Sequence, residues 1–247
     1  MVEQGSDRIA WSVVIPAYNE AGRIASTVEA AVEFVRGEGG GEVIVVDDGS
    51  RDETAALVDN FRRDHPEVKL LRNERNRGKG YSVRRGMVEA RGSLRLFCDA
   101  DGSTPLREAR KLFARLEGGE ADVAIGSREM PDSDVARPQP RYRRVMGWVF
   151  RKLVAALVVR GFRDTQCGFK AFRAEAARDV FRRLRLDGFA FDVEAIFVAR
   201  RLGYRVVEVG VRWLDSGQSR VRPVRDSLRM LRDLFRIRIN ALRGRYG

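Results

Sequence analysis

The stretch EVIVVDDGS, at residues 42–50, decides the fold class because a continuous apolar run ends abruptly in two carboxylates, a glycine and a serine. Strands that are apolar throughout are typical of parallel sheets covered by helices on both faces. The following residues, 51–64, have helical spacing, and Ser50 with Glu53 three positions later predicts an N-cap with a capping box. The stretch therefore predicts a strand, a turn and a helix of an α/β domain.

The same alternation continues on both sides of this stretch. Further strands are predicted at residues 11–16, 68–71, 94–98 and 121–126, and further helices at residues 20–36, 80–91 and 106–116. The second half is less regular, with helical patterns at residues 141–160, 192–202 and 223–242, a loop and strand at 164–172, and a strand at 204–213. This order predicts a single domain over residues 1–247, built on one doubly wound, mostly parallel sheet flanked by helices.

Composition excludes several classes of protein. Apolar residues make up 44% of the 247 residues, which is too many for an intrinsically disordered chain. Two cysteines cannot staple a fold of this size, and the single histidine, His65, excludes a multi-histidine metal site. No apolar run approaches the roughly 20 residues of a bilayer-spanning helix, and the polar N-terminus predicts no signal peptide.

Charge is distributed unevenly along the chain. Residues 1–135 carry a net charge of −5, whereas residues 136–247 carry a net charge of +17. The basic second half predicts an anionic partner, which is a membrane surface, phosphate groups or nucleic acid, and the alternative is a solvated arginine-rich surface. The aromatic residues are not interleaved with the basic ones as they are in proteins that bind single-stranded nucleic acid.

Residues 223–242 are predicted to form a basic amphipathic helix at the C-terminus. The apolar side chains that share one face are Val224, Leu228, Leu231, Phe235 and Ile239. The arginines lie mostly on the other faces, which is typical of a helix lying on an anionic membrane. The alternative is that the apolar stripe packs on the sheet and only the arginines face solvent.

Polar residues follow four of the predicted strands, at the edge where sheets of this kind bind ligands. These strand ends are Ala17–Glu20, Asp47–Ser50, Asp99–Asp101 and Ser127–Arg128. Asp99 and Asp101, after the strand at 94–98, are spaced so that both reach one Mg²⁺ or Mn²⁺ ion. Ser103 is a further candidate ligand, directly or through water. The alternative for this motif is a turn with helix-capping acids.

Three other motifs have both a binding and a structural interpretation. Asp47 or Asp48 can accept a hydrogen bond from a base or a ribose hydroxyl, or the two acids simply precede a capped turn. Tyr18 can pack on a flat base and Glu20 can bond it, or their segment PAYNE is a plain turn. Lys79 lies in the glycine-rich NRGKG stretch, where it neutralises a phosphate or is a solvated turn lysine.

These motifs together resemble a known family. PAYNE, VDDGS, NRGKG, DAD and GSR, in this order and spacing, resemble the inverting family 2 glycosyltransferases with the GT-A fold. In the second half, RDTQCGFKAF, FAFDVE and GQSR resemble the dolichyl-phosphate β-glucosyltransferase branch, with the mannose synthases more distant. The resemblance covers about residues 10–240, and DTQCGFK is its most specific element.

The resemblance implies roles for individual positions in the first half. The residues that fall where the family holds the nucleotide are Pro16, Ala17, Tyr18, Glu20 and Asp48. We add Asp47 and Lys79 to this set, because a carboxylate can accept a hydrogen bond from a ribose hydroxyl and a lysine can neutralise a phosphate. Asp99 and Asp101 fall where the family holds a divalent metal and the donor diphosphate, so Mg²⁺ or Mn²⁺ is the expected cofactor.

The resemblance also implies residues for the acceptor side. Arg128, in GSR, falls where relatives bind the phosphate of the lipid acceptor, and Arg143 or Arg144 is expected to share that role. Arg220 matches a flexible loop that closes over donor phosphates. These arginines would gather two phosphate-bearing substrates, a task that suits bidentate guanidinium groups.

The expected catalytic residues are drawn from both halves. Gln166 and the Asp192/Glu194 pair fall where the family lines the donor-sugar pocket. With Asp101 and Arg128, Gln166 and Asp192 form the predicted catalytic set. A phosphate monoester acceptor is already anionic near neutral pH, so no strong general base is required.

The predicted reaction is inverting transfer of a hexose, in the first place glucose from UDP-glucose, to a polyprenyl phosphate. Residues 1–135 would bind the nucleotide sugar and residues 136–247 would face the acceptor and an anionic membrane. Eukaryotic members of the branch begin with a membrane anchor that this sequence lacks, which predicts peripheral contact at the cytoplasmic face. The alternatives are a mannose synthase using GDP-mannose, a transferase with a soluble or polysaccharide acceptor, and a non-catalytic binding module. No nucleic-acid partner is expected.

Overall fold

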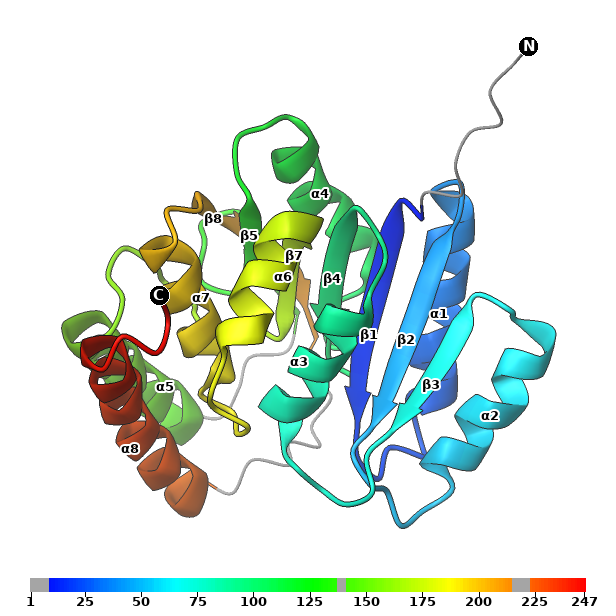
Figure 1. The fold of residues 1–247 in the computed structure, drawn as a ribbon, viewed down its shortest axis with the longest axis horizontal. Coiled ribbons are helices and arrows are strands. Elements are labelled where there is room, and N and C mark those ends of the chain that lie inside the picture. Colours follow the sequence, from blue (N-terminus) through cyan, green and yellow to red (C-terminus); the bar gives the residue numbers. More distant parts are fainter. Residues whose placement is uncertain (1–8, 137–140, 215–222) are drawn as a thin grey trace.

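A computed structural model describes residues 9–136, 141–214 and 223–247 of the chain. Its centre is a seven-stranded sheet with the strand order β3-β2-β1-β4-β7-β5-β8 (Figure 1). The strands are β1 (Trp11–Ala17), β2 (Gly41–Asp47), β3 (Val68–Arg72), β4 (Leu94–Cys98), β5 (Val123–Ser127), β7 (Phe169–Arg173) and β8 (Val206–Gly210). All neighbouring pairs are parallel except those made by β7, which runs antiparallel to β4 and β5. The predicted mostly parallel sheet is therefore confirmed.

Helices cover both faces of the sheet. The elements on one face are α1 (Ile24–Gly37), α2 (Thr54–Asp64), η1 (Leu106–Glu108) and α4 (Ala109–Glu117). The elements on the other face are α3 (Lys79–Glu89), α5 (Arg141–Leu157), α6 (Ala174–Arg183), α7 (Phe191–Arg201) and α8 (Pro223–Leu242). Figure 1 shows α3 and α6 lying across the near face, with α5 and α8 side by side beyond α7.

The alternation of side chains along the strands divides the interior into two cores. In β1, Val13 and Ile15 belong to the core under α1 and α4, whereas Val14 belongs to the core under α3 and α6. In β2, Val45 and Val46 divide in the same way. Successive side chains of a strand point to opposite faces, so a run that is apolar at every position is buried on both sides.

Several boundaries differ from the sequence-based expectation. The capping box predicted at Ser50 and Glu53 is wrong, because α2 begins only at Thr54. Ser50 Oγ accepts instead from the N–H of Asn19 at 2.9 Å, while Asp52 Oδ1 accepts from the N–H and hydroxyl of Thr54 at 3.0 and 2.6 Å. The serine thus joins two loops across the sheet edge, and the helix takes its local stabilisation from the aspartate.

The second half contains two features that the sequence did not predict. Helix α6 follows β7 directly and buries Ala176, Ala177, Val180 and Phe181. The strand predicted at 204–213 is split into β8 and β9 (Arg212–Trp213), and β9 pairs in parallel with β6 (Asp134–Val135). None of the described helices is long and apolar enough to cross a membrane.

Candidate active site at the carboxyl edge of the sheet

The candidate site lies at the carboxyl ends of the parallel strands, the lower edge of the sheet in Figure 1. Loops after β1, β2, β4 and β5 meet here because these strands all point the same way. Strand β7 runs in the opposite direction, so the loop that precedes it, residues 164–168, reaches the same edge. The antiparallel strand therefore adds the DTQCG segment to a site otherwise built from strand ends.

A pocket of about 290 Å³ lies beside the ends of β1 and β2. Its lining residues are Tyr18, Gly49, Ser50, Arg51, Arg72, Asn73, Glu74, Arg75 and Asn76. Of the residues predicted to hold the nucleotide, Tyr18 lines this pocket. Pro16 and Ala17 are buried within β1 and do not line the pocket.

The two acids after β2 organise the loops around this pocket. Asp48 accepts hydrogen bonds from the Asn73 amide at 2.7 Å and from the N–H groups of Arg77 and Gly78 at 2.9 and 2.8 Å. Asp47 Oδ1 accepts from the N–H of Ser50 at 3.2 Å, and its other oxygen lies 3.6 Å from Arg72 Nε. Both carboxylates are buried in this arrangement.

The PAYNE segment is fixed against the loop after β2. Asn19 has a left-handed backbone, with φ of +53°, and its Oδ1 accepts from the N–H of Arg51 at 2.8 Å. The N–H of Glu20 donates to Thr54 Oγ1 at 2.7 Å, and its carboxylate pairs with Arg23. Glu20 is therefore a buried carboxylate at the junction of two loops.

An acidic cluster follows β4. Asp99 Oδ1 lies 2.5 Å from Lys79 Nζ, and the Asp99 side chain is 36% exposed. Asp101 Oδ1 accepts from the N–H of Ser103 at 2.9 Å, which turns the chain back toward η1. The carbonyl of the buried Ser103 accepts from the N–H of Leu214 at 2.8 Å. The predicted metal ligands are thus neighbours in one turn.

Lys79 keeps its positive charge in this position. Burial alone lowers the pKa of its ammonium group, but the nearby carboxylates of Asp99, Asp192 and Asp101 outweigh burial and raise the pKa above its ordinary value. The cluster after β4 is therefore electrostatically built for a cation. Carboxylate oxygens are the donors that Mg²⁺ and Mn²⁺ prefer, so Asp99 and Asp101 fit a divalent ion. Within residues 9–136, 141–214 and 223–247, no third His, Cys, Asp or Glu completes a metal-binding group with them.

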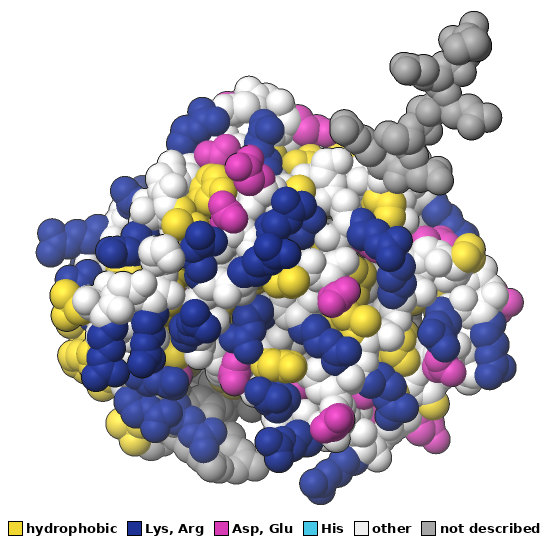
Figure 2. Space-filling model, in the orientation of Figure 1, with side chains coloured by type: hydrophobic (Ala, Val, Ile, Leu, Met, Phe, Trp, Pro, Cys, Tyr) yellow, Lys and Arg dark blue, Asp and Glu magenta, His cyan; other side chains and the backbone are white. Residues whose placement is uncertain are grey.

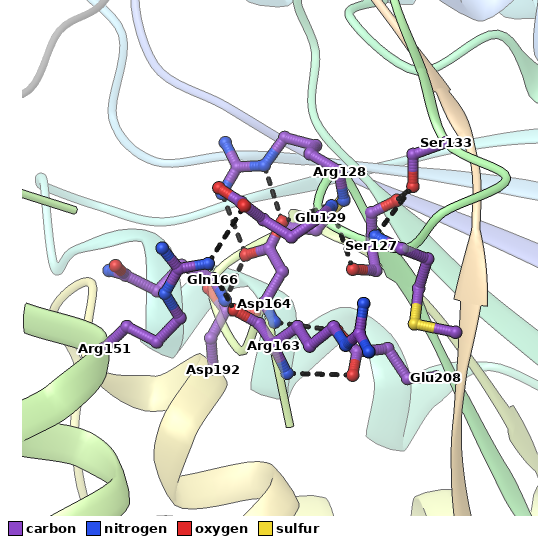
Figure 3. A network of polar contacts seen from close by, with 12 residues as sticks. Ser127, Arg128, Glu129, Ser133, Arg151, Arg163, Asp164, Gln166, Asp192 and Glu208 are labelled. Atoms are coloured by element: carbon purple, nitrogen blue, oxygen red, sulfur yellow. Dashed lines mark hydrogen bonds and ion pairs between the residues drawn. The ribbon is translucent and has the colours of Figure 1, made fainter. Parts of the chain in front are cut away.

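Arg128, at the end of β5, is held by a bidentate ion pair (Figure 3). Its Nε and Nη2 lie 2.6 and 2.9 Å from the two oxygens of Asp164, and its own N–H donates to Asp164 Oδ2 at 3.1 Å. The guanidinium carbon also lies 5.4 Å from the centre of the Trp213 ring. Two parallel bonds and a ring contact fix the plane of this arginine.

The ion pair between Arg128 and Asp164 depends on pH through the protonation of Asp164. Burial raises the pKa of Asp164, but Arg128 more than compensates and lowers it to about 2. Because the folded-state pKa is depressed, the pair stabilises the protein above the ordinary carboxyl pKa of about 4. That contribution is lost as the pH falls from about 4 toward 2.

Neighbouring groups hold Asp164 in turn. Glu208 of β8 accepts from the N–H groups of Arg163 and Asp164 at 2.9 and 2.7 Å. The N–H of Gln166 donates to Asp164 Oδ1 at 3.1 Å, which leaves the Gln166 side chain at the same edge. Arg151 of α5 joins the loop after β5 to the loop before β7 (Figure 3). Its Nη1 lies 3.0 Å from a carboxylate oxygen of Glu129 and donates to the carbonyl of Arg163 at 3.2 Å.

Asp192, at the start of α7, forms a second buried pair. Its Oδ1 lies 2.6 Å from Lys170 Nζ, which also donates to the carbonyl of Cys167 at 2.6 Å. Burial raises the pKa of Asp192, although Lys170 and Lys79 oppose the shift. Glu194 is directed elsewhere, because it accepts from Tyr246 and from the N–H groups of Arg185 and Leu186. Glu194 therefore anchors the C-terminus rather than facing the acidic cluster.

The structure brings most of the predicted residues to one edge. Those gathered around the acidic cluster and the Arg128 pair are Lys79, Asp99, Asp101, Ser103, Arg128, Gln166 and Asp192. Arg220 and the side chains of Arg143 and Arg144 lie outside the described residues. The sequence analysis missed Asp164, Lys170 and Glu208. The first two flank Gln166 in the DTQCGFK motif, so their position in the most specific motif was the available signal.

Gly168 has no side chain, and this leaves room for the carboxylate of Asp99. A Cβ atom at this position would lie 2.2 Å from Asp99 Oδ2. Gly168→Ala should displace that carboxylate by roughly 1 Å. It should therefore lower kcat by about 10²-fold, because a misplacement of this size costs about that factor in rate. Steady-state kinetics would measure the loss. Gly37→Ala is the control, because a Cβ there meets nothing within 4 Å. Unchanged kcat in Gly168→Ala would show that the position of Asp99 does not matter.

The chain is similar to characterised proteins over nearly its whole length. A family profile described as Glycosyl transferase family 2 matches residues 12–181. The dolichyl-phosphate beta-glucosyltransferase of Dictyostelium discoideum is 36% identical over 96% of this chain and 76% of its own length. The Drosophila melanogaster protein of the same name is 38% identical over 98% of this chain and 78% of its own length.

A solved structure shares the fold. Glucosyl-3-phosphoglycerate synthase from Mycobacterium tuberculosis, in complex with Mn²⁺, UDP and phosphoglyceric acid, covers 97% of this chain and 79% of its own. The two structures align with a TM-score of 0.68 at 24% identity. The family profile matches more than half of the chain, the two relatives match nearly all of it, and the chain belongs to glycosyl transferase family 2.

Proposed function

We propose that this protein transfers glucose from UDP-glucose to a polyprenyl phosphate, with inversion at the anomeric carbon. The observation that carries the proposal is the similarity along nearly the whole chain to dolichyl-phosphate beta-glucosyltransferases at 34–38% identity. The geometry supports it, because an acidic cluster suited to a cation and a fixed arginine lie at one sheet edge.

The donor would bind across the loops after β1, β2 and β4. Tyr18 lines the pocket beside β2, which suits a nucleoside, and Asp48 holds the loop that carries Lys79. A divalent cation held by Asp99 and Asp101 would supply charge neutralisation for the leaving diphosphate. Lys79 would add a second positive charge at the same end of the donor. Glucose would then lie toward Gln166 and Asp192.

The acceptor would bind at Arg128. The pair with Asp164 engages Nε and Nη2, and a guanidinium carries further donors on its remaining nitrogen. An acceptor phosphate would accept bonds from those donors while Asp164 keeps the plane of the guanidinium fixed. The phosphate oxygen is already an anionic nucleophile, so the protein contributes chiefly position and electrostatic stabilisation.

A surface on α5 and α8 would dock on the membrane at its cytoplasmic face. The exposed apolar side chains of this docking surface are Trp148, Val149, Leu228, Phe235, Ile239 and Leu242. The inner face of α8 packs on the core through Met230, Leu234 and Ile237. The helix therefore carries both an inward apolar face and an outward one. Figure 2 shows many basic side chains beside apolar ones over the region of α8, a combination that suits anionic lipids.

Polar substitutions in the docking surface should weaken vesicle binding without unfolding the protein. Because Leu228, Phe235 and Leu242 are 65%, 50% and 84% exposed, their joint replacement by Ser should leave the fold intact. Affinity for vesicles with anionic lipid should fall by at least about tenfold, since each side chain loses burial worth roughly 1.5–3 kcal/mol if fully inserted. Vesicle co-sedimentation measures this. Val135→Ser, which alters an exposed apolar residue on β6, is the control, and equal binding by the triple variant would remove the membrane assignment.

A donor panel tests the whole proposal. Purified protein with Mn²⁺ or Mg²⁺ and a short polyprenyl phosphate would be incubated separately with UDP-glucose, UDP-N-acetylglucosamine, UDP-galactose and GDP-mannose. Mass spectrometry of the lipid fraction should show a glycosyl phosphoryl lipid from UDP-glucose. A product from GDP-mannose alone would identify a mannose synthase. Transfer only to a soluble acceptor would contradict the lipid half of the proposal.

A further inference from the structure

The ammonium group of Lys79 forms an ion pair with Asp99, a carboxylate that the proposed function assigns to metal binding. Lys79 Nζ lies 2.5 Å from Asp99 Oδ1, and the lysine side chain is only 21% exposed. The same nitrogen lies 5.8 Å from the centre of the Phe191 ring, at the start of α7. Lys79 thus lies between the acidic cluster and α7 rather than in open solvent.

The backbone around Lys79 is held from both sides. Asp48 accepts from the N–H groups of Arg77 and Gly78, just before the lysine. The N–H of Gly80, just after it, donates to the carbonyl of Asp187 at 2.8 Å. Gly78 has a φ of +107°, and a Cβ atom there would lie 2.3 Å from that same carbonyl. Only the lysine side chain is therefore free to change its partner.

We propose that Lys79 is an internal counter-ion that competes with the divalent cation for Asp99 and turns to the donor diphosphate when the donor binds. This inference rests on the proposed function, which supplies the metal and the diphosphate. A metal ion bound to Asp99 Oδ1 and an ammonium group at 2.5 Å from the same oxygen repel each other. Metal binding to the nucleotide-free protein is therefore disfavoured as long as Lys79 keeps this position.

The diphosphate removes this competition. Its oxygens offer Lys79 an anionic partner of its own, so the ammonium group can leave Asp99 without losing its ion pair. The nucleotide then strengthens metal binding, and by thermodynamic reciprocity the metal strengthens nucleotide binding by the same factor. The lysine disfavours a metal-loaded site without donor and favours the complete complex.

Metal binding to the lysine variants tests the inference without measuring catalysis. Isothermal calorimetry would give the Mn²⁺ affinity of wild type, Lys79→Met and Lys79→Arg, each with and without UDP. Without UDP, Lys79→Met should bind Mn²⁺ about fivefold more tightly, because an ion pair of this exposure contributes up to about that factor. With UDP the difference should narrow to less than about twofold. Lys79→Arg keeps the charge and should remain near wild type.

A neighbouring cation provides the matched control. Arg77 lies in the same loop, but its guanidinium carbon lies over the Tyr81 ring at 4.1 Å. Arg77→Met should change the Mn²⁺ affinity by less than twofold, which separates the Asp99 contact from a general loss of charge. Lys79→Gln repeats the test should the methionine variant not fold, as judged by circular dichroism.

The outcomes separate this inference from the proposed function. Equal or weaker Mn²⁺ binding by Lys79→Met and Lys79→Gln, in a protein whose wild type forms glucosyl lipid, would overturn the counter-ion role alone. An equal gain in Arg77→Met would also overturn it. Absence of Mn²⁺ binding to every variant, with and without UDP, would overturn both the metal assignment and the counter-ion role.

Discussion

Asp101→Asn should lower kcat for glycosyl transfer by about 10³-fold and leave the fold unchanged. Asp101 is one of two carboxylates proposed to hold the divalent cation, and neutralising one of them weakens stabilisation of the leaving diphosphate by several kcal/mol. Each 1.4 kcal/mol corresponds to roughly a tenfold change in rate. The side-chain oxygen of asparagine can still accept from the N–H of Ser103, the bond that Asp101 Oδ1 makes at 2.9 Å.

Two measurements distinguish lost chemistry from lost structure. Steady-state kinetics with saturating Mn²⁺ should show the fall in kcat, while thermal unfolding should place Tm close to that of wild type. Asp187→Asn is the matched control, because Asp187 is a partly exposed acid near this edge that pairs with Arg84. Activity of Asp101→Asn within tenfold of wild type would remove Asp101 from the metal site.

Arg128→Ala should impair both acceptor binding and stability. It removes the proposed ligand of the acceptor phosphate, so KM for the polyprenyl phosphate should rise at least about tenfold, the effect of roughly 1.4 kcal/mol. It also leaves Asp164, whose side chain is 6% exposed, without its guanidinium partner. A buried charge left unpaired in this way costs about 3 kcal/mol of unfolding free energy. Affinity for UDP should stay within twofold of wild type.

A double variant separates the two effects. In Arg128→Ala with Asp164→Asn, no unpaired carboxylate remains, so chemical denaturation should show recovery of part of the lost stability. The KM for the acceptor should stay high, because the arginine is still absent. If the double variant restored acceptor KM as well, Arg128 would be a structural residue. Equal loss of UDP and acceptor binding in the single variant would place the acceptor phosphate elsewhere.

Local patterns in the sequence determined the class of fold and the edge that carries the site. Continuous apolar runs such as residues 43–46 are buried on both faces, and this requires a parallel sheet between two layers of helices. Polar residues that end parallel strands must meet at one edge, so Asp99, Asp101 and Arg128 were predicted at the same edge, and the order and direction of the strands place them there. These conclusions need only the period of the side chains and the direction of the strands.

Local patterns failed where long-range pairing decides. Ser50 and Glu53 fit a capping box, but the serine hydroxyl is taken by the N–H of Asn19, 31 residues earlier in the chain. A contact between two loops stabilises that serine, and α2 begins four residues after it, at Thr54. No short window of sequence contains both partners, so the spacing alone favoured the wrong one.

The tertiary structure alone decided how the site is held. Strand β7 enters the sheet between β4 and β5 in the opposite direction, and this brings Asp164 to Arg128 and Lys170 to Asp192. Each pair joins side chains 22 to 36 positions apart, so strand order and register set their distances. The sequence by itself determined the residues at the strand ends, through the local burial of each strand. Folding determined their partners, because a buried charge is tolerated only where the packed sheet supplies its counter-ion.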